Sequence, residues 1–295
     1  MSRKGVWGLQ GVRDKYLKSL WVQEKKLWAL GGPSSLNHSK QFGNPDDADP
    51  ASARSSSGNN AGAKDWDTMS VSNFDNQHLY YKEMGTDDWY VMGRNVYGSL
   101  GMNQGPGPFK EDKPIAYPAG SGKTWGMFAS SRDATIAVKT DGTLWAWGEN
   151  EYGQTGNNRL PNTTSGVSSP MQIPGTWDTT DLGRTGTRES NMAIDSQGNL
   201  YAMGRNDDGE LGQNNRTNRS SPVQIPGSWK AVRGAHDAVL AIKTDGTLWG
   251  WGKNQYGEIG KNQTATQWSS PTQIGTDSTW GVLGNSSFTF MAGKT

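Results

Sequence analysis

A glycine-rich frame that recurs along the chain constrains its fold more than any other feature. The frame reads aromatic-x-x-Gly-x-Asn-x-x-Gly-x-x-Gly, and it occurs at residues 89–101, 144–156, 200–212 and 248–260. The segment "LWALGG" at residues 27–32 is a degenerate fifth copy. An interval of about 50–60 residues between copies is typical of a solenoid, an array or a propeller.

Each repeat unit also carries the signals of four short strands. Two alternating runs flank an Asp-Gly or Gln-Gly pair in "TIAVKTDGTLW" and "NMAIDSQGNLY", which is a hairpin signature because glycine adopts positive φ freely. A third strand is predicted after a tryptophan, as in "WKAVRG", and a fourth at "SPVQIPG". One such sheet cannot bury both faces, but repetition around an axis can. The sequence therefore predicts an all-β fold, a β-propeller of four-stranded blades.

The domain organisation follows from the extent of the repeats. We predict a basic N-terminal arm at residues 1–26 and a propeller at residues 27–295, with five blades, or six if one is composite. Residues 33–64 are almost free of large apolar groups and are interpreted as a flexible loop. We expect residues 288–292 to pair with residues 27–30, closing the ring so that neither edge stays open.

The repeat resembles that of a known family. The stretch "VRGAHDAVLAIKTDGTLWGWGKNQYGEIG" followed by "SSPTQI" is similar to the repeat of the regulator of chromosome condensation family. The resemblance extends over residues 66–292, and more loosely over residues 20–65. It implies a propeller of four-stranded blades and a structural role for the repeat's histidine, here His236. The founding members have seven blades, more than this chain offers. The resemblance alone implies no activity, because fold and function are separable.

Composition excludes several classes of site. The chain has 14 Trp and no Cys, so it holds no disulfide, thiolate or cysteine-based zinc site. No apolar run reaches the roughly 18–20 residues of a membrane span, and the N-terminus lacks the apolar core of a signal peptide. We therefore expect a virion or cytoplasmic location and no membrane partner.

The repeated aromatic and asparagine positions favour structural roles. Trp147 and Trp251 stand where other copies have Met92 and Met203, an exchange typical of a core position. The tryptophans are therefore predicted to pack between blades. The frame asparagines are predicted to bond the turn backbone.

No catalytic, cofactor or metal site is predicted. The glycine frame lacks the following helix that a phosphate loop requires. "AGSGKTWG" at residues 119–126 ends like a P-loop, but Tyr117 stands where the first glycine would fall. The three histidines have no ligand spacing, and the acidic loop at 206–212 lacks the ligand count of a calcium loop.

Interaction candidates are the residues that stand out from this scaffold. Ten residues before each hairpin turn lie Asn76, Arg132, Arg188 and His236, which equivalent positions would gather into a ring at one mouth of the channel. Hydrogen bonding within the fold and ligand binding are both open for this ring. Trp268, interpreted as a loop residue without a counterpart, is the candidate for stacking on a sugar. The full set of candidates is Arg3, Lys4, Trp7, Arg13, Lys15, Arg132, Arg188, His236 and Trp268.

Three functions remain in view. The first is a non-enzymatic interaction or assembly protein that presents loops and the N-terminal arm to protein partners. Its most concrete version is a virion component, because small propellers of this kind look similar to phage-encoded capsid, tail or fibre proteins. The second is nucleotide exchange on a small GTPase, which the family resemblance suggests, and the third is a sugar-binding propeller. We prefer a protein partner for the basic arm over nucleic acid.

Overall fold

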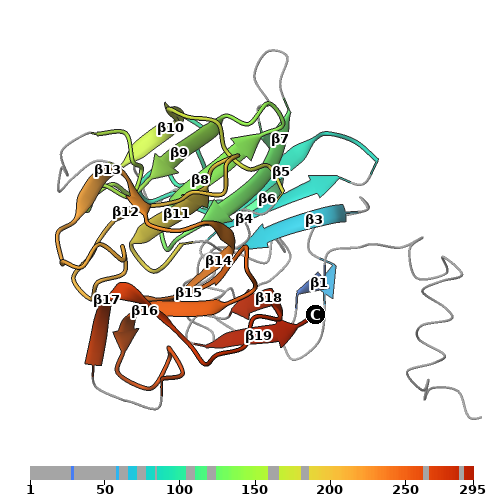
Figure 1. The fold of residues 1–295 in the computed structure, drawn as a ribbon. Helices are drawn as coiled ribbons and strands as arrows, with labels where there is room; N and C mark the ends of the chain where they lie inside the picture. Colours follow the sequence, from blue (N-terminus) through green and yellow to red (C-terminus); the bar gives the residue numbers. More distant parts are fainter. Residues whose placement is uncertain are drawn as a thin grey trace, which may run out of the picture.

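The computed structural model describes residues 28–29, 58–59, 66–71, 78–83, 85–103, 110–117, 124–158, 166–180, 186–261, 266–285 and 289–295. Their regular elements are all strands, and all strand pairs are antiparallel. Figure 1 shows the sheets following one another around a common centre. Among these residues, no helix is long and apolar enough to cross a lipid bilayer.

Three sheets have the predicted four strands, paired in chain order, and we number the blades along the chain. Blade 1 contains β3 (Trp66–Val71), β4 (His78–Glu83), β5 (Trp89–Arg94) and β6 (Lys110–Tyr117). Blade 2 contains β7 (Trp125–Ser130), β8 (Ala134–Lys139), β9 (Leu144–Gly148) and β10 (Val167–Ile173). Blade 4 contains β14 (Trp229–Ala235), β15 (Ala238–Lys243), β16 (Leu248–Asn254) and β17 (Thr266–Gln273).

Within the described residues, blade 3 shows three strands, and its first strand is represented by a single bridge. Its sheet contains β11 (Ser190–Ile194), β12 (Leu200–Gly204) and β13 (Arg219–Ile225). A single bridge between Trp177 and Asp195 stands where the other blades have their first strand. The same register joins Trp125 to Lys139 in blade 2 and Trp229 to Lys243 in blade 4, so the bridge retains the repeat's pairing.

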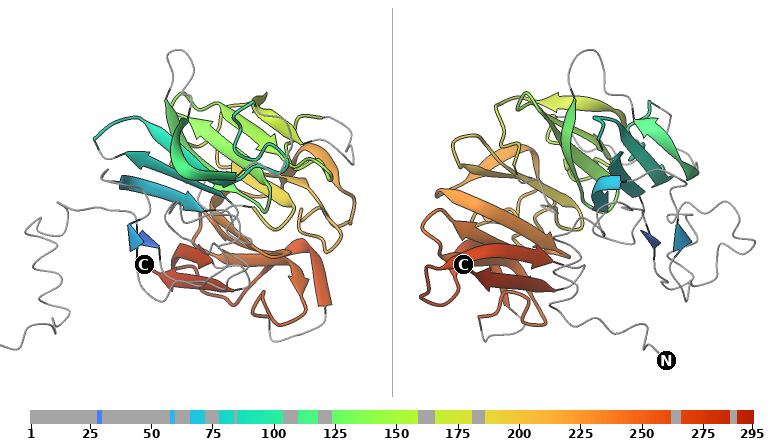
Figure 2. Two further views of the ribbon diagram at one scale, coloured as in Figure 1. Left: turned by 180° about the vertical axis from the view of Figure 1, so that it is seen from behind. Right: turned by 90° about the vertical axis from the view of Figure 1, so that its right-hand side faces the viewer.

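Two short sheets complete the described chain. β18 (Trp280–Asn285) pairs with β19 (Phe290–Lys294), and β1 (Trp28–Ala29) pairs with β2 (Gly58–Asn59). The predicted pairing of the terminal strands with each other is not formed by the described strands, and the right-hand view of Figure 2 shows the two pairs apart. Gly58 and Asn59 also lie in a strand, although the sequence predicted a flexible loop there.

The core lies between blades rather than within one sheet. The first strands β3 and β7 adjoin, as do β14 and β18, so these neighbouring sheets approach each other at their first strands. One cluster joins Tyr80 of blade 1 to Trp147 of blade 2, and another joins Met192 of blade 3 to Trp251 of blade 4. These apolar faces are buried only when neighbouring blades stack, as the repeat pattern predicts.

Candidate functional site

The glycine frames of blades 1, 2 and 3 form loops that dock on the next blade. In blade 3, Asn206 Oδ1 accepts a hydrogen bond from Leu211 N at 2.9 Å, which holds the loop in shape. Gly209 has φ +84°, and a Cβ there would lie 2.5 Å from Ser269 Cα in β17 of blade 4. Asn214 N then donates to Ser269 O at 2.6 Å. The same docking joins blade 1 to blade 2 and blade 2 to blade 3.

The predicted role of the frame asparagines is confirmed in all four copies. Each side-chain oxygen accepts from the backbone N–H five residues later, at 2.9–3.1 Å. The residues are Asn95, Asn150, Asn206 and Asn254.

Buried tryptophans tie blades 2 and 4 to the loop of the blade before each of them. Trp147 Nε1 donates to Ser99 O at 2.9 Å, and Trp251 Nε1 donates to Glu210 O at 2.7 Å. Both indoles and Met203 are fully buried. The prediction that these positions pack between blades is therefore confirmed, and these residues are unavailable to a ligand.

The polar ring predicted from spacing is brought together by the backbone. Arg132 N donates to Arg188 O at 3.1 Å, and Arg188 N donates to His236 O at 2.7 Å. These three residues lie in or beside the inner turns of blades 2, 3 and 4, with 24–37% of each side chain exposed. Asn76 lies outside the described residues. The three candidates thus form a continuous row at one end of the blades.

The charges in this row are compensated by carboxylates of the same turns. Glu189 Oε2 pairs with Arg205 at 2.6 Å, and its Oε1 lies 3.9 Å from Arg132 Nη1 and 3.8 Å from Arg188 Nε. Asp237 pairs with His236 Nδ1 and with Lys253 Nζ, the latter at 3.7 Å. The row is therefore an ionic network and not an open cationic patch.

Burial of carboxyl groups beside this network shifts their pKa values. Desolvation, reinforced by Asp133 and Glu189, raises the pKa of Glu149 to about 7. Desolvation, reinforced by the negative charges of Asp237 and Asp208, raises the pKa of Glu210 to about 8.

A cluster of three carboxylates forms where the acidic frame loop meets the next blade. Asp208, Glu210 and Asp237 offer ligand oxygens that all lie within 4.8 Å of one another. Burial opposes ionisation of Asp237, but the hydrogen bond from His236 and the charges of His236 and Lys253 lower its pKa. Because His236 and Lys253 already pair with Asp237, the cluster gives no independent support for a metal, and the absence of a metal site stays a prediction.

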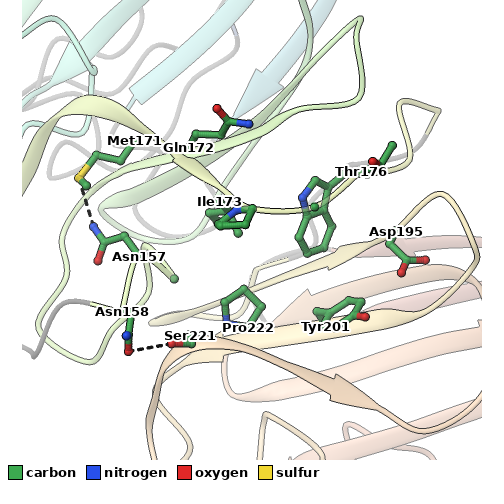
Figure 3. Close-up of a pocket in the computed structure, with 14 residues that line it drawn as sticks. Asn157, Asn158, Met171, Gln172, Ile173, Thr176, Asp195, Tyr201, Ser221 and Pro222 are labelled. Carbon is green, nitrogen blue, oxygen red and sulfur yellow. Dashed lines mark hydrogen bonds between the residues drawn. The ribbon is translucent and has the colours of Figure 1, made fainter.

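A cavity of about 490 Å³ opens between blades 2 and 3 (Figure 3). Met171 and Ile173 of β10 line one side, and Tyr201 of β12 and Pro222 of β13 line the other. Trp177 and Tyr201 form an edge-to-face pair, with centroids 5.4 Å apart. Volume and mixed lining are typical of a small-ligand or side-chain pocket. Sequence reasoning did not single out this cavity.

Trp268 is not the exposed loop residue that the sequence predicted. It lies in β17, paired with Gly252, and its ring packs against the core shared by blades 3 and 4. It also has counterparts, since Arg219 pairs with Gly204 and Val167 pairs with Gly148 in the same register. The strand was not predicted because the residues around Trp268 are polar and because the bulge after Gly250 interrupts the register. The five arm candidates lie outside the described residues.

Sequence reasoning also missed Arg205 and Lys253, which supply cations to the ionic network. Both occupy the variable position between the glycine and asparagine of the frame, where blade 2 has Glu149. The recurrence of a charged residue at this position of the frame could have indicated their role.

The described geometry agrees with comparisons to known proteins. Residues 197–242 and 128–154 match models described as regulator of chromosome condensation (RCC1) repeats. Protein RCC2 of Homo sapiens is 28% identical over 165 residues, covering 56% of this chain and 27% of the relative. The ultraviolet-B receptor UVR8 of Arabidopsis thaliana is 31% identical over 157 residues, covering 50% of this chain and 32% of the relative. This chain thus spans about a third or less of either relative's length.

A solved structure shares the fold. Prp20p of Saccharomyces cerevisiae superposes with a TM-score of 0.60 at 17% identity, covering 76% of this chain and 53% of that one. At this identity the likeness concerns the fold alone. Residues 128–154 and 197–242 thus carry repeats of the regulator of chromosome condensation type, in an all-β fold similar to that of Prp20p.

Proposed function

We propose that this chain is a non-enzymatic protein-interaction propeller whose binding face includes the row of Arg132, Arg188 and His236. The backbone hydrogen bonds that set these residues side by side are the observation that carries the proposal. Arginines held by carboxylates while partly exposed are pre-organised donors, and arginine is enriched in protein interfaces. The repeated tryptophans, glycines and asparagines, by contrast, support the fold.

Quantitative affinity capture from an extract of the source cells tests this face. The double variant Arg132→Ala/Arg188→Ala should lose the proteins that the wild type retains. Lys230→Ala/Arg216→Ala removes two exposed positive charges away from the row and should retain them. Equal capture by both double variants, with unchanged thermal unfolding, would place the binding surface elsewhere.

Nucleotide exchange on a small GTPase is the second candidate. It is favoured by the fold shared with Prp20p, whose structure has been described together with its binding to Gsp1p and histones. Acceleration of labelled GDP release from a panel of GTPases would establish this function. Unchanged release would leave the interaction proposal standing.

The sugar-binding and virion hypotheses are narrower. Trp268 is partly buried against the core shared by blades 3 and 4, so the pair of Arg132 and Arg188 is the better remaining candidate for the sugar hypothesis. The virion version stays a prediction about the arm: deleting residues 1–25 should abolish incorporation into a particle while the propeller stays folded. Normal incorporation of the truncated chain would contradict it.

We propose further that the propeller is a closed ring of five blades, or six with a composite one. A strand has two edges, so β1 and β19 can pair with each other as well as with their described neighbours. Because the chain has no Cys, the double variant Ala29→Cys/Ala292→Cys tests the closure directly. A disulfide under mild oxidation is expected, and none would form if the two strands stay apart.

A further inference from the structure

An edge-to-face aromatic pair recurs in blades 2, 3 and 4, on the strands that flank each blade's second strand. The ring centroids are 6.3 Å apart for Trp125 and Trp145, and 6.4 Å apart for Trp229 and Trp249. In blade 3 the pair is Trp177 and Tyr201, as described above. The three pairs are structurally equivalent, so their surroundings can be compared directly.

In blades 2 and 4 a lysine of the same blade covers the pair. Lys139 Nζ lies 4.7 and 4.5 Å from the centroids of Trp125 and Trp145. Lys243 Nζ lies 5.1 and 3.7 Å from the rings of its own pair. A third lysine, Lys294, lies 5.2 Å from Trp280. An ammonium group over an indole face is an attractive cation–π contact, so the fold repeatedly places a cation at this position.

Blade 3 has a carboxylate where the other blades have the lysine. Asp195 is paired with Trp177 in the register that Lys139 and Lys243 occupy in their blades. Its oxygens accept hydrogen bonds from Gln197 N, Asn199 N and Asn199 Nδ2 at 2.8–2.9 Å. These donors are neutral, and no basic side chain of the described residues lies within ion-pair distance of Asp195.

The charge of Asp195 is therefore uncompensated within the described chain. Partial burial opposes its ionisation, but hydrogen bonds from Asn199, Gln197 and Tyr201 lower its pKa. The carboxyl group is thus ionised near neutral pH. Blade 3 therefore has an anion beside its aromatic pair, whereas blades 2 and 4 have a cation at the equivalent position.

The cavity of Figure 3 opens onto this carboxylate and aromatic pair. Asp195 is the single charged residue among those that line it. Met171 and Ile173 on one side and Pro222 on the other are the apolar side chains that lead to it. A lysine side chain has the matching order of groups, since its apolar methylenes precede the ammonium head.

We propose that the cavity between blades 2 and 3 binds a lysine side chain supplied by a protein partner. The ammonium contacts Asp195 and the pair of Trp177 and Tyr201, in the place that an internal lysine takes in blades 2 and 4. The methylenes lie along Met171 and Pro222. The site deepens the proposed protein-binding role and rests on that role for the origin of the lysine, whereas the pocket itself is testable with small probes.

Titration with Nα-acetyl-lysine methylamide, followed through the indole N–H resonances, tests the pocket. The resonance assigned to Trp177 by a Trp177→Phe variant should shift and saturate. The norleucine analogue, which lacks the ammonium, should bind at least about fivefold more weakly, as a partly exposed charge contact of about 1 kcal/mol implies. Equal binding of both analogues would overturn the proposal.

Two substitutions separate the cation site from general packing. Asp195→Lys restores the residue type of blades 2 and 4, so it should fill the cavity and abolish the titration. Because it also removes the hydrogen bonds from Gln197 and Asn199, the melting temperature should fall slightly while unfolding stays cooperative. Lys243→Asp is the reciprocal change and should create a second saturable response at the indole resonances of Trp229 and Trp249. Binding that survives Asp195→Lys would show that the probe lies elsewhere and would overturn the proposal.

The source of the cation is decided by a parallel titration. Tetramethylammonium that binds more tightly than the lysine probe would replace a partner's lysine with a free quaternary ammonium ligand. Probe binding without any captured partner would support the pocket while contradicting the protein-interaction role. Captured partners that are unaffected by Asp195→Lys would support that role and contradict the place of this pocket in it.

Discussion

Two copies of the glycine frame have the same backbone and different surroundings. In blade 3, Gly209 has φ +84° and its α-carbon faces the backbone of Ser269 in the next blade. In blade 4, Gly257 has φ +85°, but no atom of the described residues lies within 4 Å of the position a Cβ would take. Its neighbour Tyr256 is 79% exposed. The glycine of the frame therefore has two separate roles. It allows the turn geometry in every copy, and it allows close backbone approach where the next blade has a fourth strand.

The largest expected effect is the difference between alanine substitutions at these two glycines, which separates turn geometry from close backbone approach. Gly209→Ala should destabilise the protein by about 2–3 kcal/mol more than Gly257→Ala, because both pay the cost of positive φ but only the first forces a methyl group into backbone. Denaturant unfolding of both variants measures the difference. Equal losses would mean that turn geometry alone explains the glycine and that docking tolerates an added methyl group.

The second comparison concerns tryptophans that bond between blades or within one. Trp251→Phe removes the hydrogen bond to Glu210 O and leaves a buried carbonyl unsatisfied, so a loss of about 1–3 kcal/mol is expected. Trp249 is half-buried and donates within its own blade, to Thr247 Oγ1 at 2.7 Å. Trp249→Phe should cost less than about 1 kcal/mol by the same measurement. A reversed order would show that joints between blades contribute little to stability.

Many of the contacts between neighbouring blades could be predicted from the sequence, because the residues that make them recur at equivalent positions of the repeat. The four frame asparagines, the buried Trp147 and Trp251, and the row of Arg132, Arg188 and His236 all follow from equivalent spacing. Trp268 was predicted to lie in a loop because its polar neighbours do not show the alternation of a strand. The bulge beside it also shifts the alignment of the repeats by one residue. The significance of Asp195 requires knowing that a lysine covers the aromatic pair elsewhere, which is a contact across strands that spacing does not reveal.

A third comparison concerns the glutamate that blades 3 and 4 share in the frame. The glutamate of the frame is buried in blade 3, where 1% of Glu210 is exposed, and half-buried in blade 4 at Glu258. The pKa of Glu210 is raised from 4.5 to about 8, so the folded protein holds a proton that the unfolded chain releases. Stability contributed by the protonated form is present below about pH 4.5 and is lost as pH rises toward 8.

Glu210→Gln removes this dependence, and blade 2 already carries Gln154 at the equivalent position. The amide oxygen can still accept from Asp208 N, as the carboxylate does at 2.9 Å. At pH 8.5 the variant should melt about 2–4 °C above the wild type, the shift expected for about 1 kcal/mol, and at pH 5 the two should melt together. Glu258→Gln, at a half-buried glutamate of the same frame, is the matched control, and an identical effect of both substitutions would contradict the burial argument.

The smallest effect is expected from the exposed side-chain bonds that accompany docking. Ser270 Oγ donates to Asn214 Oδ1 at 3.2 Å, and Ser221 and Asn158 make the same bond one blade earlier at 3.0 Å. Because water replaces an exposed bond readily, Ser270→Ala should cost about 0.5 kcal/mol or less in denaturant unfolding. Asn214 has φ +57°, so Asn214→Ala should cost more than Ser270→Ala through backbone strain. If the serine variant were the more damaging of the two, side-chain bonding rather than backbone approach would distinguish the docked frame from the free one.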